Sequence, residues 1–520
     1  MNNKTASPPS GPAIGPSADE LAAALNLYEN ALPPGTRFRF DISALDILGM
    51  PVIVDALILE DGTWVDGFGY GASLEEARVG ALGELSEVAH LTRAIAADPG
   101  VTASFSEMVV REGADRVIDP RCLALPAGTV WKSSDPMHWL QVRRWPEGTA
   151  WVPREFVAHT HEVYASGITG PLIPPCVTPI TNGNGAGVTL EQALAHGVLE
   201  LLQRDGNTTR FRAMDPGIVI ALDEVVDPGI KALLARLRAK GIEPLAKLAA
   251  TEFGTPSVYV VDNGTAQPGF PLQITACGEA AHPNAERALR KALLEFMAAR
   301  CRKTMMHGPL DPIRSFAGDA YINAVHEYAN PAAQEPRTLE AMLEWMSLPV
   351  DVLRARLQDR VLSQTRTVAL HDLPSVPDAD VRDPVRRLHD LSARLSDAGH
   401  EIFFYDATPA TGGPIVIKAI VSGLECETMS YHRIGLRGVQ RLMLEPPPGG
   451  GGVLAGIGTP PQGAKPVLLT PAHEERLGGV PWLDTDRIDA IVGALYPLYR
   501  EPASHTVQLR LQQNRTQGRA

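Results

Sequence analysis

Three segments of the chain repeat one pattern of polar, small, aliphatic and acidic positions. Each ends on glutamate, with an aliphatic residue two positions earlier, alanine seven earlier and Ser, Thr or Asn eleven earlier; the segments are 73–84, 189–200 and 284–295. Because positions seven apart lie on one face of a helix, each glutamate shares a stripe with an alanine. The pattern predicts three capped helices, each with a carboxylate where most helices place a core residue.

Runs of β-branched and aromatic residues predict the strands. These runs lie within 38–65 and at 130–132, 139–142, 151–153, 257–262, 402–406 and 414–421. Further helices are predicted after Ser17, at 230–240 and near 485–499. A glycine-containing segment, expected to be a loop, precedes each repeated helix, at 67–73, 181–187 and 278–283. The recurring unit is strand, loop and capped helix, an arrangement that brings backbone N–H groups to phosphates.

Composition divides the chain into three parts. Residues 1–35 combine a Pro-, Ser-, Gly- and Ala-rich start, expected to be disordered, with a short helix. Residues 36–445 hold the repeats and form the main domain. Residues 446–520 begin with a Pro- and Gly-rich linker and continue as a C-terminal extension with a polar, frayed tail.

Charge and cysteine usage narrow the class of protein. A formal net charge of -13 argues against broad binding of nucleic acid or an anionic membrane. No apolar run is long enough for a membrane span, and residues 1–10 do not resemble a signal peptide. The five cysteines form no CxxC pair, which indicates a reducing compartment without disulfides or structural zinc. We expect a cytoplasmic enzyme or binding protein.

The repeated helices carry candidate chemistry. Glu84 and Glu87, three residues apart, project from one side of a helix and can share a cation. Mg²⁺ prefers such oxygen ligands and bridges them to substrate phosphates. In the second helix, Glu200 could serve a metal while Arg204 clamps phosphate oxygens.

Each pair also has an ordinary explanation. Glu87 alone fits a solvated helix surface, and Glu200 with Arg204 fits an i,i+4 ion pair. Lys291 and Glu295 of the third helix fit the same kind of pair. Recurrence at three equivalent positions favours a shared charged ligand over three unrelated surface pairs.

Two other candidates carry less weight. His159 and His161 alternate as in a strand and would face one side, but no third metal ligand follows, so an exposed strand face is favoured. Cys301 lies between Arg300 and Arg302, which would lower its pKa. No companion base is identifiable, and a buried or incidental thiol is favoured.

The motifs resemble those of the YcaO family. The first motif is Gly67-Phe-Gly-Tyr-Gly-Ala-Ser with Ala81-Leu-Gly-Glu84-Leu-Ser-Glu87. The second, which is quite specific, is Thr181-Asn-Gly-Asn-Gly-Ala-Gly with residues 193–205. The third is residues 278–284 with Lys291-Ala-Leu-Leu-Glu295, and Val421-Ser-Gly-Leu-Glu425 followed by Arg433 is similar to the closing strand and turn. The resemblance runs from about 52 to 444, in the expected order.

The resemblance implies an α+β YcaO fold, with helices packed on mostly antiparallel sheets around a nucleotide site. It also implies ATP- and Mg²⁺-dependent O-phosphorylation of peptide-backbone amides. Attack by a cysteine, serine or threonine side chain gives azolines by cyclodehydration, whereas a sulfide donor gives thioamides. The substrate would be a ribosomally made peptide or protein, with a possible leader-binding or sulfur-delivery partner and possible homodimerisation.

Site residues follow from matching positions. The resemblance assigns Mg²⁺ to Glu84, Glu87 and Glu200. It assigns the nucleotide to Asn182, Gln192, Gln203, Arg204, Lys291 and Glu295.

Several positions depart from the family pattern. Gln192 and Gln203 stand where glutamate is expected, Lys291 replaces a usual arginine, Tyr70 a common lysine and Gly80 a usual serine. An amide ligates Mg²⁺ less well than a carboxylate because it carries no charge. The proline-rich C-terminus typical of azoline-forming members is also missing. Two hypotheses therefore stand: an ATP-dependent amide-modifying enzyme, or a degenerate nucleotide- or peptide-binding scaffold for a partner enzyme.

Overall fold

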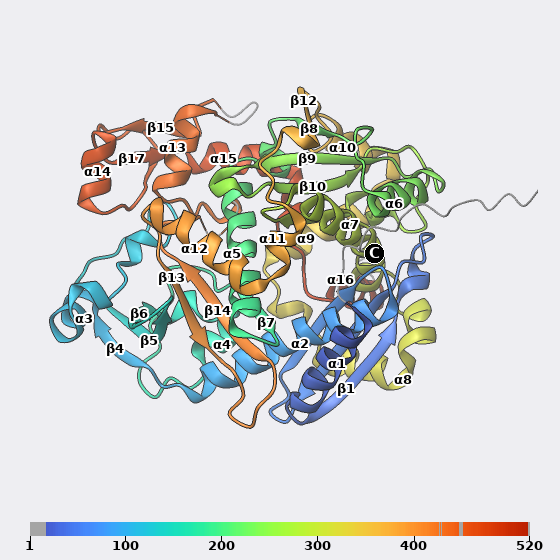
Figure 1. Cartoon of the computed structure of the whole chain (residues 1–520), viewed down its shortest axis with the longest axis horizontal. Helices are drawn as coiled ribbons and strands as arrows, with labels where there is room; N and C mark the ends of the chain where they lie inside the picture. The colour runs from blue at the N-terminus through green and yellow to red at the C-terminus, as the bar shows by residue number, and fades with distance from the viewer. Residues whose placement is uncertain (1–16, 426, 428, 447–450, 518–520) are drawn as a thin grey trace, which may run out of the picture.

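The computed structural model describes residues 17–425, 427, 429–446 and 451–517, and its fold is α+β, as predicted (Figure 1). Three larger sheets and one small sheet are flanked by helices. Among the named strands, every pairing is antiparallel except that of β8 with β12. Most of the segment expected to be disordered, residues 1–16, and positions 447–450 of the expected linker lie outside the described residues.

The first sheet is an antiparallel meander near the start of the chain. Its strands are β1 (Gly35–Asp41), β2 (Val52–Leu59) and β3 (Trp64–Tyr70). All side chains of β2 are buried, because α2 (Leu74–Ala97) covers one face and α8 (Leu310–Tyr328) packs on the other. Helix α1 (Ala18–Ala31), capped by Ser17 as predicted, packs on α2.

The second sheet has the strand order β4-β5-β13-β14-β7, with β6 paired to β5. The bounds are β4 Val101–Ser104, β5 Pro136–Arg144, β6 Thr149–Pro153, β7 Asn184–Gly187, β13 Ile402–Asp406 and β14 Ile415–Val421. The strand predicted at 130–132 is absent, since those residues have no regular structure. Helices α5 (Leu190–Asn207) and α12 (Pro384–Asp397) share a buried apolar cluster with β13 and β14. The short helices α3 (Phe105–Glu112) and α4 (His161–Ala165) lie beside the same sheet.

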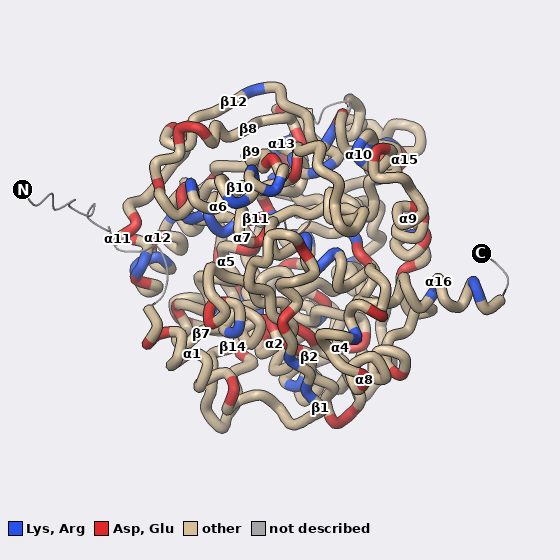
Figure 2. Tube along the Cα trace, turned by 90° about the vertical axis from the view of Figure 1, so that its right-hand side faces the viewer, with Lys and Arg blue, Asp and Glu red and all other residues tan. Residues whose placement is uncertain are grey.

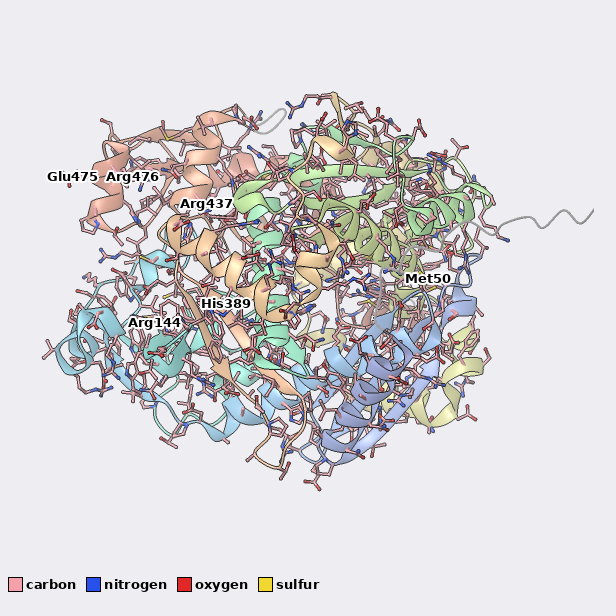
Figure 3. All side chains as sticks on the ribbon, in the orientation of Figure 1. Met50, Arg144, His389, Arg437, Glu475 and Arg476 are labelled. Carbon is pink, nitrogen blue, oxygen red and sulfur yellow. The ribbon has the colours of Figure 1, made fainter. Side chains whose placement is uncertain are left out.

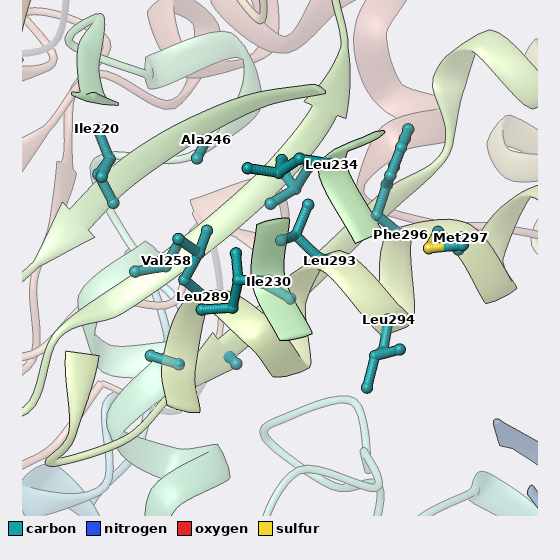
Figure 4. Close-up of a cluster of buried hydrophobic side chains, with 14 of the residues drawn as sticks. Ile220, Ile230, Leu234, Ala246, Val258, Leu289, Leu293, Leu294, Phe296 and Met297 are labelled. Atoms are coloured by element: carbon teal, nitrogen blue, oxygen red, sulfur yellow. The ribbon is translucent and has the colours of Figure 1, made fainter. Parts of the chain in front are cut away.

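The third sheet has the order β11-β10-β9-β8-β12. The bounds are β8 Ile218–Ala221, β9 Pro244–Ala250, β10 Ser257–Asp262, β11 Cys277–Ala281 and β12 Arg366–Ala369. Successive side chains of β10 alternate between two cores. Val258 and Val260 pack with α6 (Pro228–Arg238) and α7 (Ala285–His307), as Figure 4 shows in part. Tyr259 packs with the helices of the opposite face, α9 (Pro336–Ser347) and α10 (Val350–Gln358).

The C-terminal extension packs against the rest of the chain. It contains the small sheet β15-β17-β16, and α13 and the short α11 precede it. The bounds are β15 Leu454–Ile457, β16 Lys465–Pro466, β17 Pro481–Leu483, α11 Asp378–Arg382, α13 Leu436–Leu444, α14 Pro471–Leu477, α15 Thr485–Val492 and α16 Thr506–Thr516. Leu498 and Val507 share the buried cluster that contains Trp345. Residues after 446 therefore contribute to a core that is formed mainly by earlier segments.

Glycines of the three repeated units lie largely within strands, and not in loops as predicted. Gly69 is in β3, Gly185 in β7 and Gly278 in β11. A Cβ atom on Gly69 would lie 1.8 Å from the carbonyl oxygen of Ala77 in α2. The equivalent distances to the backbone of α5 and α7 are 2.3 Å from Gly185 and 2.1 Å from Gly278. Glycine is needed because each helix lies directly on the strand before it.

Helix α5 occupies the centre of the molecule (Figure 1). It contacts β7 and β14 of the second sheet and β9, β10 and β11 of the third. Acidic and basic positions are interspersed along the trace in Figure 2, without a broad basic face in that view. The three glutamate-bearing helices α2, α5 and α7 therefore bring their charged positions into a shared interior.

Candidate functional site

The repeated helices begin where the sequence predicts. The side chains of Ser73, Thr189 and Asn284 each accept a hydrogen bond from the backbone N–H three residues later. Each cap satisfies one of the N–H groups that a helix N-terminus leaves without a partner. The start of each helix, and therefore the position of its glutamate, is fixed relative to the strand before it.

The glutamates of the first two repeats are held in the same way. Oε2 of Glu84 accepts a hydrogen bond from Phe68 N in β3, at 2.7 Å. Oε2 of Glu200 accepts one from Gly183 N, just before β7, at 2.9 Å. Each carboxylate is thus anchored to the strand region of its own unit, which fixes one oxygen and leaves the other for a different partner.

Two contacts join the units to one another. Oε1 of Glu87 accepts a hydrogen bond from Ala186 N in β7 at 2.9 Å, which links the first helix to the second unit. The hydroxyl of Tyr70 donates to Oε2 of Glu295 at 3.2 Å, which links β3 to the third helix. The predicted metal and nucleotide residues of three separate segments therefore meet around one centre.

Several buried carboxyl groups crowd together at the centre, and their pKa values are raised. Burial raises the pKa of Glu84 to about 7, against the opposing influence of Arg302. Burial also raises the pKa of Glu87 well above its usual range, and the neighbouring carboxylates of Glu200 and Glu84 raise it further. The pKa of Glu295 is raised by burial and by Glu279, while Lys291 lowers it. Carboxylates that raise one another's pKa in this way are stabilised by a bound cation.

The donor set fits Mg²⁺ held together with phosphates. Among the described residues, no group of three or more His, Cys, Asp or Glu side chains forms a closed metal site. Mg²⁺ usually keeps several waters and binds through one or two carboxylates plus substrate phosphates. Oε1 of Glu84 and Oε2 of Glu87 accept no hydrogen bond from the described part of the chain, so these oxygens are available to such an ion.

Arg204 is fixed by two carboxylates. Its Nη1 lies 3.0 Å from Oε2 of Glu279, and its Nη2 lies 3.5 Å from Oε1 of Glu200. The predicted i,i+4 pair is therefore present and does not exclude a role at the site. Gln203 and Asn207 also donate to Oε2 of Glu279, at 3.0 and 2.8 Å. The side-chain amide of Gln203 in α5 therefore donates its hydrogen bond to Glu279 of β11.

Glu279 has a central place that the sequence analysis missed. It lies in β11, within the third motif, at a position where the strand's other side chains are small. The available signal was a single acidic residue inside a buried, apolar strand, since such a carboxylate requires partners.

The other predicted nucleotide residues are Gln192 and Lys291. Oε1 of Gln192 accepts a hydrogen bond from Val188 N at 3.1 Å, much as Glu76 accepts one from Ala72 N at 2.7 Å. Gln192 therefore stabilises the turn into α5. Lys291 is exposed and lies close enough to lower the pKa of Glu87.

A cavity of about 440 Å³ adjoins this centre. Asn182, Arg204 and Glu295 line it, which brings three predicted nucleotide residues to one space. The cavity is also lined by residues from the end of β11, the C-terminal half of α7 and the extension: Cys277, Glu279, Arg302, Lys303, Met306, Leu498, Tyr499, Arg500 and Glu501. The contribution of the extension was not predicted, because its segment 498–501 is far from every motif in the sequence.

Two candidates from the sequence have structural roles. The strand predicted around His159 and His161 is wrong: His161 begins α4, and His159 is buried beside Thr92, with its Nε2 3.2 Å from the hydroxyl. Cys301 is a buried thiol, as the sequence favoured, and burial raises its pKa to about 12 in place of the lowering expected from the neighbouring arginines. Arg300 turns away from the thiol to pair with Asp46 at 2.8 Å. A membrane-spanning helix is not found anywhere in the described part of the chain.

Comparisons with known proteins agree with this geometry. A family model described as YcaO cyclodehydratase, ATP- and Mg²⁺-binding, matches residues 68–425. An uncharacterized protein of Methanothermobacter thermautotrophicus is 27% identical over 405 residues, covering 76% of this chain and 91% of the relative.

Two solved structures share the fold. The YcaO protein of Methanopyrus kandleri, bound with AMPPCP and Mg²⁺, is 17% identical with a TM-score of 0.52, covering 80% of this chain and 93% of that one. A heterocyclase in complex with substrate and cofactor is 16% identical with a TM-score of 0.56, covering 82% of this chain and 55% of that one. The predicted fold is confirmed, as are ATP and Mg²⁺ as ligands of the family. The chain therefore belongs to the YcaO family of ATP- and Mg²⁺-binding proteins.

Proposed function

We propose that the protein uses ATP and Mg²⁺ to phosphorylate a backbone amide oxygen of a peptide or protein, for cyclodehydration or thioamidation. The observation that carries this proposal is the convergence of Glu84, Glu87 and Glu200 from two helices. Burial and the neighbouring carboxylates raise the pKa of Glu84 and Glu87, and a Mg²⁺-bound triphosphate would stabilise their ionised forms.

Different residues of the chain would bind Mg²⁺ and the phosphates. Glu84, Glu87 and Glu200 would hold Mg²⁺, which when bound neutralises the charge that develops on the phosphates. Arg204, fixed between Glu200 and Glu279, would present its guanidinium to the phosphates in one orientation. Lys291 would supply a second, mobile cation from the exposed edge.

The remaining assigned residues have supporting places. Asn182 and Glu295 would line the nucleotide's space, since both line the cavity. Tyr70 would hold Glu295 in position through their hydrogen bond. Gln192 would act through the turn into α5, and Gln203 through Glu279, rather than as direct Mg²⁺ ligands.

The chemistry follows from the poor leaving ability of an amide oxygen. A nucleophile attacks the amide carbon, and the amide oxygen takes the γ-phosphoryl group as ADP departs. The C–O bond then breaks, inorganic phosphate leaves, and the nucleophile's bond to carbon remains. In such a reaction the protein mainly positions the triphosphate and neutralises its charge. The three glutamates and Arg204 would serve both tasks.

A scaffold function is the second candidate. Gln203 and Gln192 place neutral amides where the family pattern has carboxylates, and Gln203 is engaged by Glu279. A protein with this site could bind nucleotide or peptide and serve a partner enzyme without turnover. A leader-binding or sulfur-delivery protein is the partner that either function would use, and cytoplasmic location and homodimerisation belong to the same proposal.

The test follows the oxygen atom. The wild type, Glu200→Ala and the exposed control Glu340→Gln are incubated with ATP, Mg²⁺ and peptides encoded by neighbouring genes, synthesised with ¹⁸O in their backbone amides, each with and without added sulfide. We expect the wild type and Glu340→Gln to transfer ¹⁸O to phosphate, and Glu200→Ala to lose the transfer. Nucleotide binding without phosphate release on any peptide would favour the scaffold. No ATP binding at millimolar concentration would exclude both ATP-dependent modification and a nucleotide-binding scaffold.

A further inference from the structure

The buried end of the cavity has an arginine, Arg212, with two donor atoms that make no hydrogen bond to the described residues. We define this end by four of its buried lining residues, Arg212, Thr275, Cys277 and Lys303. The Arg212 side chain is only 8% exposed. Its Nε and Nη1 atoms donate no hydrogen bond to any residue that the structure describes. A buried charged donor left without an acceptor is destabilising, and more so than a neutral one.

The nearby carboxylates are committed to other cations. Oε1 of Glu279 lies 3.8 Å from Nη2 of Arg212, beyond hydrogen-bond distance, while its Oε2 accepts from three other side chains. Glu501 pairs with Lys303 and lies 3.0 Å from Nε2 of His307. These two partners lower the pKa of Glu501 despite its burial, which raises it. Glu427, another buried carboxylate of the cavity, pairs with Arg500 and lies 3.8 Å from Nη1 of Arg433. None of these three carboxylates accepts a hydrogen bond from Nε or Nη1 of Arg212.

The backbone around Arg212 is strained and held in place. Arg212 has a φ of 59°, an uncommon conformation for a residue other than glycine. The Tyr499 hydroxyl donates to the carbonyl of Phe211 and accepts from Ala213 N, both at 2.8 Å. The Arg212 guanidinium also lies over the Phe211 ring, 4.4 Å from its centroid. The extension thus fixes the strained turn that delivers Arg212 to the cavity.

We propose that the buried end of the cavity is a second anion site, separate from the nucleotide, which binds a small oxyanion through Arg212 with support from Lys303 and Arg302. An oxyanion supplies the acceptors that Nε and Nη1 lack, and guanidinium groups match its geometry. Arg302 lines the same cavity and has a buried Nε that likewise donates no hydrogen bond to a described residue. Burial raises the pKa of the Cys277 thiol, so this side chain remains neutral and does not oppose an anion.

Two oxyanions share this chemistry: phosphate released from ATP, and a sulfur oxyanion such as thiosulfate. The site rests on the cavity and on Arg212, and it does not require the amide chemistry to be correct. Its role within the proposed function would be to hold product phosphate or a sulfur-bearing co-substrate near the nucleotide.

The test is calorimetric titration of phosphate, sulfate and thiosulfate into protein saturated with Mg²⁺ and AMPPCP, at constant ionic strength. We expect one site on the wild type, at least tenfold weaker binding by Arg212→Gln, and no change for the exposed control Arg366→Gln. Unchanged AMPPCP binding by Arg212→Gln shows that the variant is folded. Phosphate binding tighter than thiosulfate identifies the product, and the reverse order identifies a sulfur donor.

Three results would overturn the second site. The first is that no oxyanion binds at millimolar concentration. The second is that the wild type and Arg212→Gln bind oxyanions equally. The third is full competition between oxyanion and AMPPCP, which would make Arg212 part of the nucleotide site. If the wild type fails to bind AMPPCP, the oxyanions are titrated into nucleotide-free protein. Failure of the proposed function is thereby separated from failure of the anion site.

Discussion

Glu84→Gln tests the charge at the centre of the site. The glutamine oxygen can still accept the hydrogen bond from Phe68 N, so the substitution removes charge with little change of shape. With a pKa of about 7, Glu84 is about nine-tenths protonated at pH 6 and mostly ionised at pH 8. A ligand that needs the carboxylate form must therefore displace a proton at pH 6, which costs about 1.4 kcal/mol, or about tenfold in affinity.

The assay is calorimetric titration of AMPPCP in excess Mg²⁺ at pH 6, 7 and 8. At pH 8 we expect Glu84→Gln to bind more weakly than the wild type. At pH 6 that difference should shrink by about tenfold or more, because the wild type has lost most of its Glu84 charge. The nucleotide's own titration cancels in this ratio. Glu340→Gln, an exposed glutamate on α9, is the matched control.

At pH 8, Glu84→Gln should raise the stability of the ligand-free protein although it lowers the affinity for nucleotide. The folded pKa of Glu84 lies above its ordinary 4.5, so ionisation costs the ligand-free protein stability. This cost begins above pH 4.5, levels off above pH 7, and amounts to about 3 kcal/mol. Glu84→Gln should therefore stabilise ligand-free protein at pH 8 while it weakens binding. A binding penalty that is equal at pH 6 and pH 8, or loss of both stability and binding, would refute the reasoning.

Three further substitutions and one control, Gly83→Ala, test the packing and contacts around the site by chemical denaturation. Gly69→Ala should lower the free energy of unfolding by about 3 kcal/mol or more, because its Cβ would lie 1.8 Å from the Ala77 oxygen. Gly83→Ala on α2 meets nothing within 4 Å and should raise the free energy of unfolding by about 0.5 kcal/mol. Tyr70→Phe should lose about 1 kcal/mol with its hydrogen bond to Glu295, and unchanged stability would contradict that bond. Asp205→Asn should lower the free energy of unfolding by about 3–5 kcal/mol, because Asp205 is buried between Arg437 (labelled in Figure 3) and Arg441. A decrease below about 1 kcal/mol would contradict this ion-pair network.

The sequence predicted the helix caps and several strands and helices around the site correctly, because each depends on residues close together in the chain. The caps Ser73, Thr189 and Asn284 each act over three residues, and all three were identified. The strands at 257–262 and 402–406 and the helix at 230–240 were also confirmed, since burial patterns within one element define them. The placement of glycines in loops was wrong, because close packing of a helix on a strand is a tertiary requirement.

The residues that were missed depend on contacts between distant segments. Glu279 is recognisable only once α5 brings Gln203 and Arg204 beside β11. Glu501 lies about 200 residues after Lys303, its partner, and no spacing rule connects them. Burial of Cys301 is likewise a tertiary effect: burial, and then Asp46 of a different segment, raise its pKa and outweigh the lowering by Arg300.

Binding of Mg²⁺-nucleotide tests the central claim most directly. AMPPCP is titrated into the wild type, Glu200→Ala and Glu340→Gln, each with Mg²⁺ and with EDTA. The structure predicts Mg²⁺-dependent binding by the wild type and Glu340→Gln, and at least tenfold weaker binding by Glu200→Ala, whose Oε2 is anchored to Gly183 N. Wild-type binding that is equally tight in EDTA, or that survives in Glu200→Ala, would contradict a shared Mg²⁺-triphosphate site for the three glutamates.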